Sequence, residues 1–320
     1  MSVPSVLVFV ARRLGAMVVL MLLLSFGVFS LTYLAPGDAV DALLGGRNST
    51  PELVNSLREE YHLNDPFLTQ YWIWAREALQ FDFGDSTRTT LPVTDEITIR
   101  LGASVFLAVY AYLLTVLFGV IPGIVAALKR HRALDRALVA GAVVTLSTPP
   151  FVLGILMLYL FAVLMPMFPA AGKGEGFVDM LWHLTLPAVT LSLTIAAFML
   201  RHTRASMITV LDQDYVTFAR ARGLARSRVL RHYLLRNALI PVITVSGVLL
   251  SYFVTGAVLV ETTFSLGGLG ELLVRSAQDS DLPMIQGLTL LIAAVIVLAN
   301  LLTDLTYMAI DPRIRYEGRT

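Results

Sequence analysis

Six long runs of apolar residues, each free of Asp, Glu, Lys and Arg, constrain this chain more than any other feature. Each run has at least 21 residues, and about 20 apolar residues are enough for a helix to cross a hydrocarbon core about 30 Å thick. Only 15% of the 320 residues are charged, against about 25% in ordinary soluble domains. The sequence therefore predicts an all-α membrane protein with six transmembrane helices. The runs are residues 14–37, 101–128, 137–172, 180–200, 237–260 and 282–303.

The charges between these runs predict how the chain crosses the membrane. The segments 1–13, 129–136, 201–237 and 304–320 hold 17 of the 24 Lys and Arg residues but only 6 of the 23 acidic residues. Because short basic loops stay in the cytoplasm, both termini are expected to be cytoplasmic. The expected organisation is a cytoplasmic segment (1–13), a first span (14–34), an extracytoplasmic loop (35–100), a core domain with the other five spans (101–310) and a cytoplasmic tail (311–320).

Several kinds of site are excluded by the residues themselves. The chain has no cysteine, and none of its five histidines lies in an H-E-x-x-H arrangement, so no metal site is expected. The lysines are Lys129 and Lys173, and neither follows the glycine spacing of a Walker A loop. No catalytic residue is predicted, and the spans carry no buried charge of the kind that ion-coupled transporters use. A partner would therefore have to supply the energy of any active transport.

The basic segment 201–237, called here the inner loop, has clear helix signals. Asp212 and Asp214 are expected at a helix start and Arg220 and Arg222 at its end, where their charges complement the helix dipole. Gly223 is expected to stop this helix, and a second helix is expected over 226–237. Tyr215, Phe218, Ala219 and Arg222 recur at spacings of three and four, which predicts one face able to enter a groove on another protein.

The pattern alone leaves a second interpretation open. The eight arginines of the inner loop would also suit an amphipathic hairpin that lies on anionic lipid.

The inner loop resembles the EAA loop of ABC importer permeases, in the form found in the dipeptide, oligopeptide and nickel family. Residues 214–224 read DYVTFARARGL and residues 236–241 read RNALIP. In this comparison Gly223 is the glycine of the loop and Ala219 is the second alanine of its EAA triplet. Thr217 and Phe218 replace the glutamate and the first alanine, so the strict triplet is absent.

The resemblance extends over nearly the whole chain. Six further segments look like this family in the same order: LAPGD (34–38), FDFGDS (81–86), STPPF (147–151), GLG (268–270) with DLPMIQG (281–287), DPRIRY (311–316), and Arg12 with Arg13 before the first span. The long loop between the first two spans is similar to that of the B-type subunit. Each segment is weak evidence alone, but their order around the inner loop is specific.

The resemblance implies a type I ABC importer permease fold and four kinds of partner. These are a second, homologous permease subunit forming a heterodimer, two ATPase subunits, an extracytoplasmic substrate-binding protein and the lipid bilayer of a bacterial cytoplasmic (inner) membrane. ATP and Mg²⁺ would bind in the ATPase subunits and no cofactor in this chain; no nucleic acid is expected. The implied ATPase-coupling residues are Asp214, Tyr215, Phe218, Ala219, Arg220, Arg222, Gly223 and Leu224.

The translocation path is expected to involve Ser147, Pro149, Pro150, Thr244 and Ser251, and prolines within the third and fifth spans are candidate hinges. The resemblance implies di- or oligopeptides as substrate, although nickel and other solutes use similar permeases. Two alternatives of other classes remain: a stand-alone ion-coupled or passive transporter, and a structural or assembly factor of the membrane.

Overall fold

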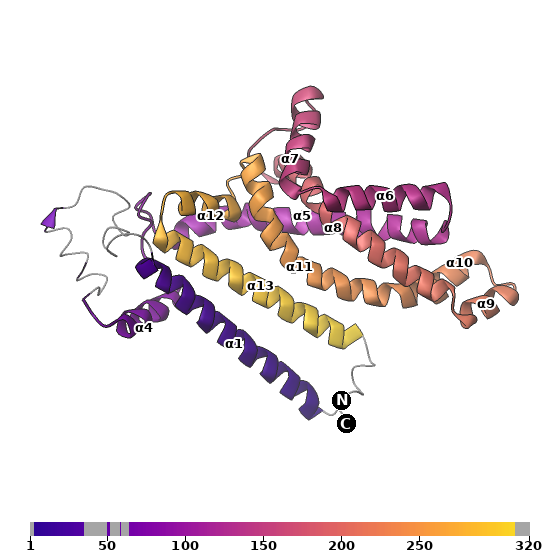
Figure 1. The fold of residues 1–320 in the computed structure, drawn as a ribbon, viewed down its shortest axis with the longest axis horizontal. Coiled ribbons are helices and arrows are strands. Elements are labelled where there is room, and N and C mark those ends of the chain that lie inside the picture. The colour runs from indigo at the N-terminus through magenta and orange to yellow at the C-terminus, as the bar shows by residue number, and fades with distance from the viewer. Residues whose placement is uncertain (1–2, 35–49, 52–57, 59–63, 311–320) are drawn as a thin grey trace. The chain divides into compact units, whose positions relative to one another are not determined.

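The computed structural model describes residues 3–34, 50, 51, 58 and 64–310, and these residues are almost entirely helical (Figure 1). The segments 34–38 and 311–316, on which part of the resemblance depends, lie wholly or largely outside this range. The elements are α1 (Val3–Leu34), α4 (Phe67–Ala78), α5 (Val93–Leu128), α6 (Ala133–Ser147), α7 (Pro150–Leu158), η1 (Tyr159–Leu164), α8 (Phe177–Leu211), α9 (Asp214–Ala221), α10 (Arg226–Arg228), η2 (Val229–Leu235), α11 (Arg236–Phe264), α12 (Leu269–Gln278) and α13 (Leu282–Ile310).

The long helices coincide with the apolar runs. In α1, α5, α8 and α13 a single helix is long and apolar enough to cross a bilayer. Two further spans are bent pairs, one formed by α6 with α7 and η1, the other by the stretch from α10 through α11. Helices are expected here because a backbone in hydrocarbon must satisfy its hydrogen bonds internally. Counting each bent pair as one span gives the six spans that the sequence predicts.

The chain divides into two compact units, which we describe separately. The first unit contains Met1–Ser104 and Gly267–Val297. In it, α4 packs beside the C-terminal end of α1 (Figure 1) through aromatic rings that include Phe29 and Tyr71, whose centroids are 5.7 Å apart. A buried apolar cluster that includes Val93 and Leu288 joins the start of α5 to α12 and α13.

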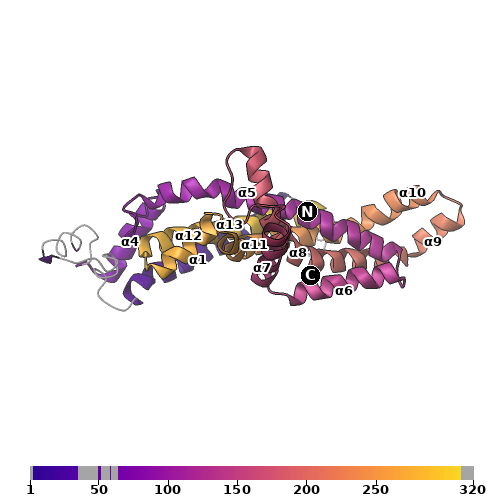
Figure 2. The ribbon, with the colours of Figure 1, turned by 90° about the horizontal axis from the view of Figure 1, so that it is seen from above.

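The second unit contains Val105–Leu266 and Leu298–Thr320, and α8 lies at its centre. In both views α6 runs beside α8 (Figures 1 and 2), and α11 packs on α8 as well. Two glycines of α5 allow a close approach to α8. A Cβ atom at Gly119 would lie 2.6 Å from Cβ of Met199, and one at Gly123 would lie 2.7 Å from Cβ of Thr203. Small residues four apart commonly let membrane helices pack this closely.

The bends agree only in part with the proline hinges expected from the sequence. The pair α6 and α7 is bent by 105°, and Pro149 and Pro150 lie at the break, as predicted. In α11, Pro241 lies within the helix, whereas the 45° bend falls between Gly247 and Leu249. A Cβ at Gly247 would lie 2.7 Å from Thr303 Cγ2, so this glycine permits close packing on α13. Glycine is a common cause of helix bending.

Candidate functional site

The short helix α9 in the inner loop is the candidate site, and its ends are set by local signals. Asp214 lies in its first turn and Arg220 in its last, where each charge complements the helix dipole. Gly223 has a φ of +74°, a left-handed conformation that glycine adopts without steric cost. Its N–H donates to Arg220 O at 3.0 Å, and the N–H of Leu224 donates to Ala219 O at 3.3 Å. These bonds close the helix at the predicted glycine.

One detail of the predicted inner loop is wrong. Asp212 caps the C-terminal end of α8 instead of starting α9, because α8 runs on to Leu211. The residues of the second predicted helix, 226–237, are helical. They are divided among α10, the π-helical segment η2 and the start of α11, so this helix continues directly into the next span.

One face of α9 is buried against its own chain. Val216 is fully buried and Ala219 is 3% exposed. Both belong to an apolar cluster with Val229 and Leu234 of η2 and with Ala238 of α11. Ala219 was expected on the docking face, together with Tyr215 and Phe218. It instead helps to seat α9 on the returning segment, where a small side chain allows close packing.

The opposite side of α9 is open. Phe218 is 67% exposed and Tyr215 39% exposed, and Arg222 is also exposed. Nδ2 of Asn237 donates to the Tyr215 hydroxyl at 3.3 Å. This contact joins the DYVTFARARGL and RNALIP segments, which are separate signals in the sequence. Figure 2 shows α9 and α10 projecting beyond the end of α8.

Two ion pairs fix the inner loop to the start of α6 and to the turn before it. Arg204 in α8 makes a bidentate contact with the buried Asp135, with distances of 2.6 and 2.8 Å. Arg130 reaches the two carboxylate oxygens of Asp212 at 2.8 and 3.0 Å. Sequence reasoning missed both pairs. The one available signal was that Asp135 and Asp212 are acidic residues in otherwise basic segments.

The remaining charge of the inner loop is positive and exposed. Among the described residues, six arginines in and after α9 make no ion pair and point to solvent: Arg220, Arg222, Arg226, Arg228, Arg231 and Arg236. The exposed surface of this segment is therefore basic and also includes the apolar ring of Phe218.

The five residues expected along the translocation path all lie in the second unit. Ser147, Pro149 and Pro150 lie at the bend between α6 and α7. The hydroxyls of Ser147 and Thr244 donate to carbonyls of their own helices, while Ser251 donates to Asn300 Oδ1 of α13 at 3.0 Å. Their place along a path stays a prediction.

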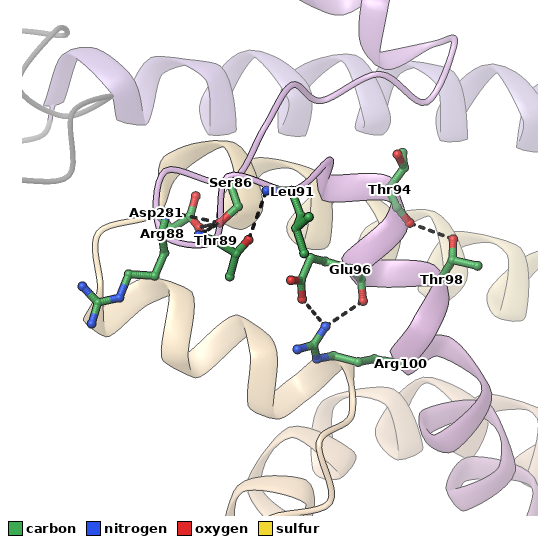
Figure 3. Close-up of polar contacts among 9 residues, drawn as sticks. All are labelled: Ser86, Arg88, Thr89, Leu91, Thr94, Glu96, Thr98, Arg100 and Asp281. Atoms are coloured by element: carbon green, nitrogen blue, oxygen red, sulfur yellow. Dashed lines mark hydrogen bonds and ion pairs between the residues drawn. The ribbon is translucent and has the colours of Figure 1, made fainter.

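In the first unit, two segments of the resemblance that are far apart in sequence meet (Figure 3). Ser86 Oγ donates to Asp281 Oδ2 at 2.5 Å, and the Thr87 N–H donates to Asp281 Oδ1 at 3.3 Å. Ser86 and Asp281 are both 2% exposed. A Cβ at Gly287 would lie 2.8 Å from Val93 and 3.2 Å from Phe83, so the glycine permits the approach. This polar contact fixes the FDFGDS segment to the start of α13.

Comparison with known proteins places the chain in a family. Residues 119–316 match the model of the binding-protein-dependent transport system inner membrane component, and residues 6–108 match the N-terminal model of the same kind of membrane component. The first match includes the whole inner loop.

Several relatives match over almost their full length. The chain is 39% identical to the probable peptide ABC transporter permease protein y4tP of Sinorhizobium fredii, over 97% of this chain and 99% of that protein. It is 36% identical to the glutathione transport system permease protein GsiC of Escherichia coli K12, over 97% and 99% of the two chains.

A solved structure supports the fold. A chain from the MetNI methionine ABC transporter, in inward-facing conformations, matches with a TM-score of 0.54 and 16% identity. The match covers 67% of this chain and 96% of that one. The chain therefore belongs to the family of inner membrane components of binding-protein-dependent transport systems and is a permease subunit of an ABC importer with the type I fold.

Proposed function

We propose that this chain forms half of the translocation pathway of an ATP-driven peptide importer in a bacterial cytoplasmic membrane. A second, homologous permease subunit completes the pathway as a heterodimer. Two ATPase subunits bind on the inner side and hold ATP and Mg²⁺, while an extracytoplasmic protein delivers the substrate. This chain carries no ATPase site and binds no cofactor. The names of the relatives, which concern peptide and glutathione transport, support peptides as the substrate class.

The main support for the coupling role is that α9 has one buried side and one exposed side. Val216 and Ala219 hold the helix to η2 and α11, while Tyr215 and Phe218 remain exposed. A helix that is fixed on one side and presents an aromatic side chain on the other is suited to enter a groove on a partner. The unpaired arginines around it suit an acidic rim on the ATPase subunit.

This arrangement also explains how a movement of the ATPase subunits would reach the spans. The cluster around Val216 connects α9 to α11, and the Asp135–Arg204 pair connects α8 to the start of α6. When ATP brings the two ATPase subunits together, α9 moves with the groove that holds it. The ends of α6, α8 and α11 then shift with α9, and the bends near Pro149 and Gly247 allow the outer parts of those spans to change their angle.

The coupling role is tested by replacing Gly223 with proline. Proline fixes φ at about −65°, whereas Gly223 has a φ of +74°. The proline would also remove the N–H group that donates to Arg220 O. We expect Gly223→Pro to reach the membrane and to lose ATP-driven peptide uptake. Uptake and ATP hydrolysis are measured with the complete transporter in liposomes.

Ala225→Pro is the matched control. Ala225 has φ of −54° and ψ of 136°, which proline adopts without strain, so this variant is expected to transport normally. Full uptake by Gly223→Pro would refute the role assigned to α9. Uptake by the purified chain without any ATPase subunit would refute the importer itself and favour a stand-alone transporter.

A further inference from the structure

The helix α4 has a second apolar surface that its contact with α1 leaves uncovered. Its packing side carries Phe67, Tyr71 and Trp74, whose rings contact aromatic side chains of α1. A separate stripe, at spacings of four, three and four, contains Leu68, Trp72, Ala75 and the capping residue Leu79. Leu68 is 63%, Trp72 68% and Leu79 83% exposed. We call this set the α4 stripe.

The exposed polar residues of α4 lie on another side of the helix, whereas Gln70 is buried beside α1 and accepts a hydrogen bond from the Tyr33 hydroxyl. Thr69 and Glu77 are exposed, and with Arg76 they follow a different line along the helix from that of the α4 stripe. The helix therefore has a side that packs on α1, an open apolar stripe, and an exposed polar side that is interrupted by Ile73. A helix with a wide apolar arc and a polar back is typical of segments that lie in the interface of a membrane.

The position of α4 along α1 indicates what covers the α4 stripe. Figure 1 shows α4 beside the C-terminal end of α1, and the contacts involve Ser25, Phe26, Phe29 and Tyr33 in the last third of that helix. The Ser25 hydroxyl lies 2.8 Å from the Tyr71 hydroxyl. Since α1 is a membrane span whose charge pattern predicts an outer C-terminal end, α4 lies at the depth of the outer boundary of the bilayer.

The surface of α1 next to this contact is itself apolar and open. Leu22, Leu23 and Phe26 are 51%, 67% and 41% exposed, as expected for a span that faces lipid. The α4 stripe is apolar and open in the same way, and Trp72 has the amphipathic ring that is enriched where hydrocarbon meets the headgroups.

We propose that α4 is an interfacial helix, with the α4 stripe inserted among the phospholipids of the outer leaflet beside the first span. The helix anchors the segment before α5 to the membrane surface. This contact is independent of the ATPase and of the substrate, so its test does not depend on the transport function.

The absence of cysteine from the chain allows a direct test with single spin labels. We would introduce cysteine in turn at Leu68, Trp72 and Leu79 on the α4 stripe, and at Thr69 and Glu77 on the exposed polar side. Each variant is labelled in the complete transporter and reconstituted in phosphatidylcholine liposomes, with the unmodified complex as the background. Accessibility to oxygen, which partitions into lipid, is compared with accessibility to a water-soluble nickel chelate. Leu23→Cys serves as the reference for lipid exposure.

The labels on the α4 stripe are expected to be reached by oxygen more than by nickel, at a depth of about 5–10 Å below the headgroups. Those at 69 and 77 are expected to show the reverse preference. Equal nickel accessibility on the α4 stripe and the polar side would place α4 in water and overturn the proposal. Labels on the α4 stripe that neither reagent reaches would show that protein covers it, which would also overturn the proposal.

Discussion

Replacing Phe218 by alanine should weaken binding of the ATPase subunits without unfolding the permease. Phe218 is 67% exposed on α9, and a phenylalanine buries about 200 Å² when it is fully enclosed. About 130 Å² is therefore open to a partner, which corresponds to about 3 kcal/mol at about 25 cal/mol per Å². Because part of that area stays exposed at an interface, we expect a loss of about 2–3 kcal/mol, or about 30- to 150-fold in affinity.

The assay is the binding of purified ATPase subunit to the permease pair in lipid nanodiscs, as a function of ATPase concentration. Thr217→Ala is the control, because Thr217 is also exposed on α9 but offers little apolar area. Its affinity should stay within about twofold of the natural chain, since surface substitutions usually change energies by less than about 0.5 kcal/mol. If the Phe218→Ala permease binds the ATPase subunit as tightly as the Thr217→Ala permease does, Phe218 is not part of the binding surface.

Three further predictions concern contacts that lie within one unit or the other. Each is measured by thermal unfolding of the purified protein in detergent. Gly123→Ala should destabilise by about 1–3 kcal/mol, because its Cβ would lie 2.8 Å from Leu200 O, whereas Gly141→Ala, with nothing within 4 Å, should not destabilise. Asp135→Ala should cost about 3 kcal/mol by leaving the Arg204 charge unpaired, while Asp212→Ala, in an exposed pair, should cost less than about 1 kcal/mol. Ser86→Ala should cost about 1.5–3 kcal/mol through the lost bond to the Asp281 carboxylate, and Thr98→Ala, whose hydroxyl bonds its own helix, should be nearly neutral. Equal effects within any of these matched pairs would contradict the corresponding contact.

The spans and the ends of α9 follow from local signals and were therefore predictable. Long runs of apolar residues indicate directly which segments lie in lipid. The charges at Asp214 and Arg220, together with Gly223, indicate where α9 begins and ends to within one turn. The bend at Pro149 was predictable for the same reason, since proline and the residue before it restrict the backbone locally.

The remaining features depend on contacts between distant residues. Ala219 is buried because η2 returns beneath α9, and nothing in the helix itself gives the position of that segment. Ser86 and Asp281 are separated by 195 positions, so their contact depends on how α5, α12 and α13 pack. The bend of α11 lies near Gly247, where Thr303 of α13 packs closely, whereas Pro241 lies near the start of the helix without breaking it.

In the proposed importer, α9 of this permease contacts the ATPase subunit. The most direct measurement places a photoreactive benzoylphenylalanine at position 218 in the assembled transporter and identifies the product of illumination. The same residue at Val144, which is 66% exposed on α6, is the control for non-specific reaction. We expect a cross-link from position 218 to the ATPase subunit and none from position 144. A product from position 218 that contains only lipid, or no protein product at all, would contradict it.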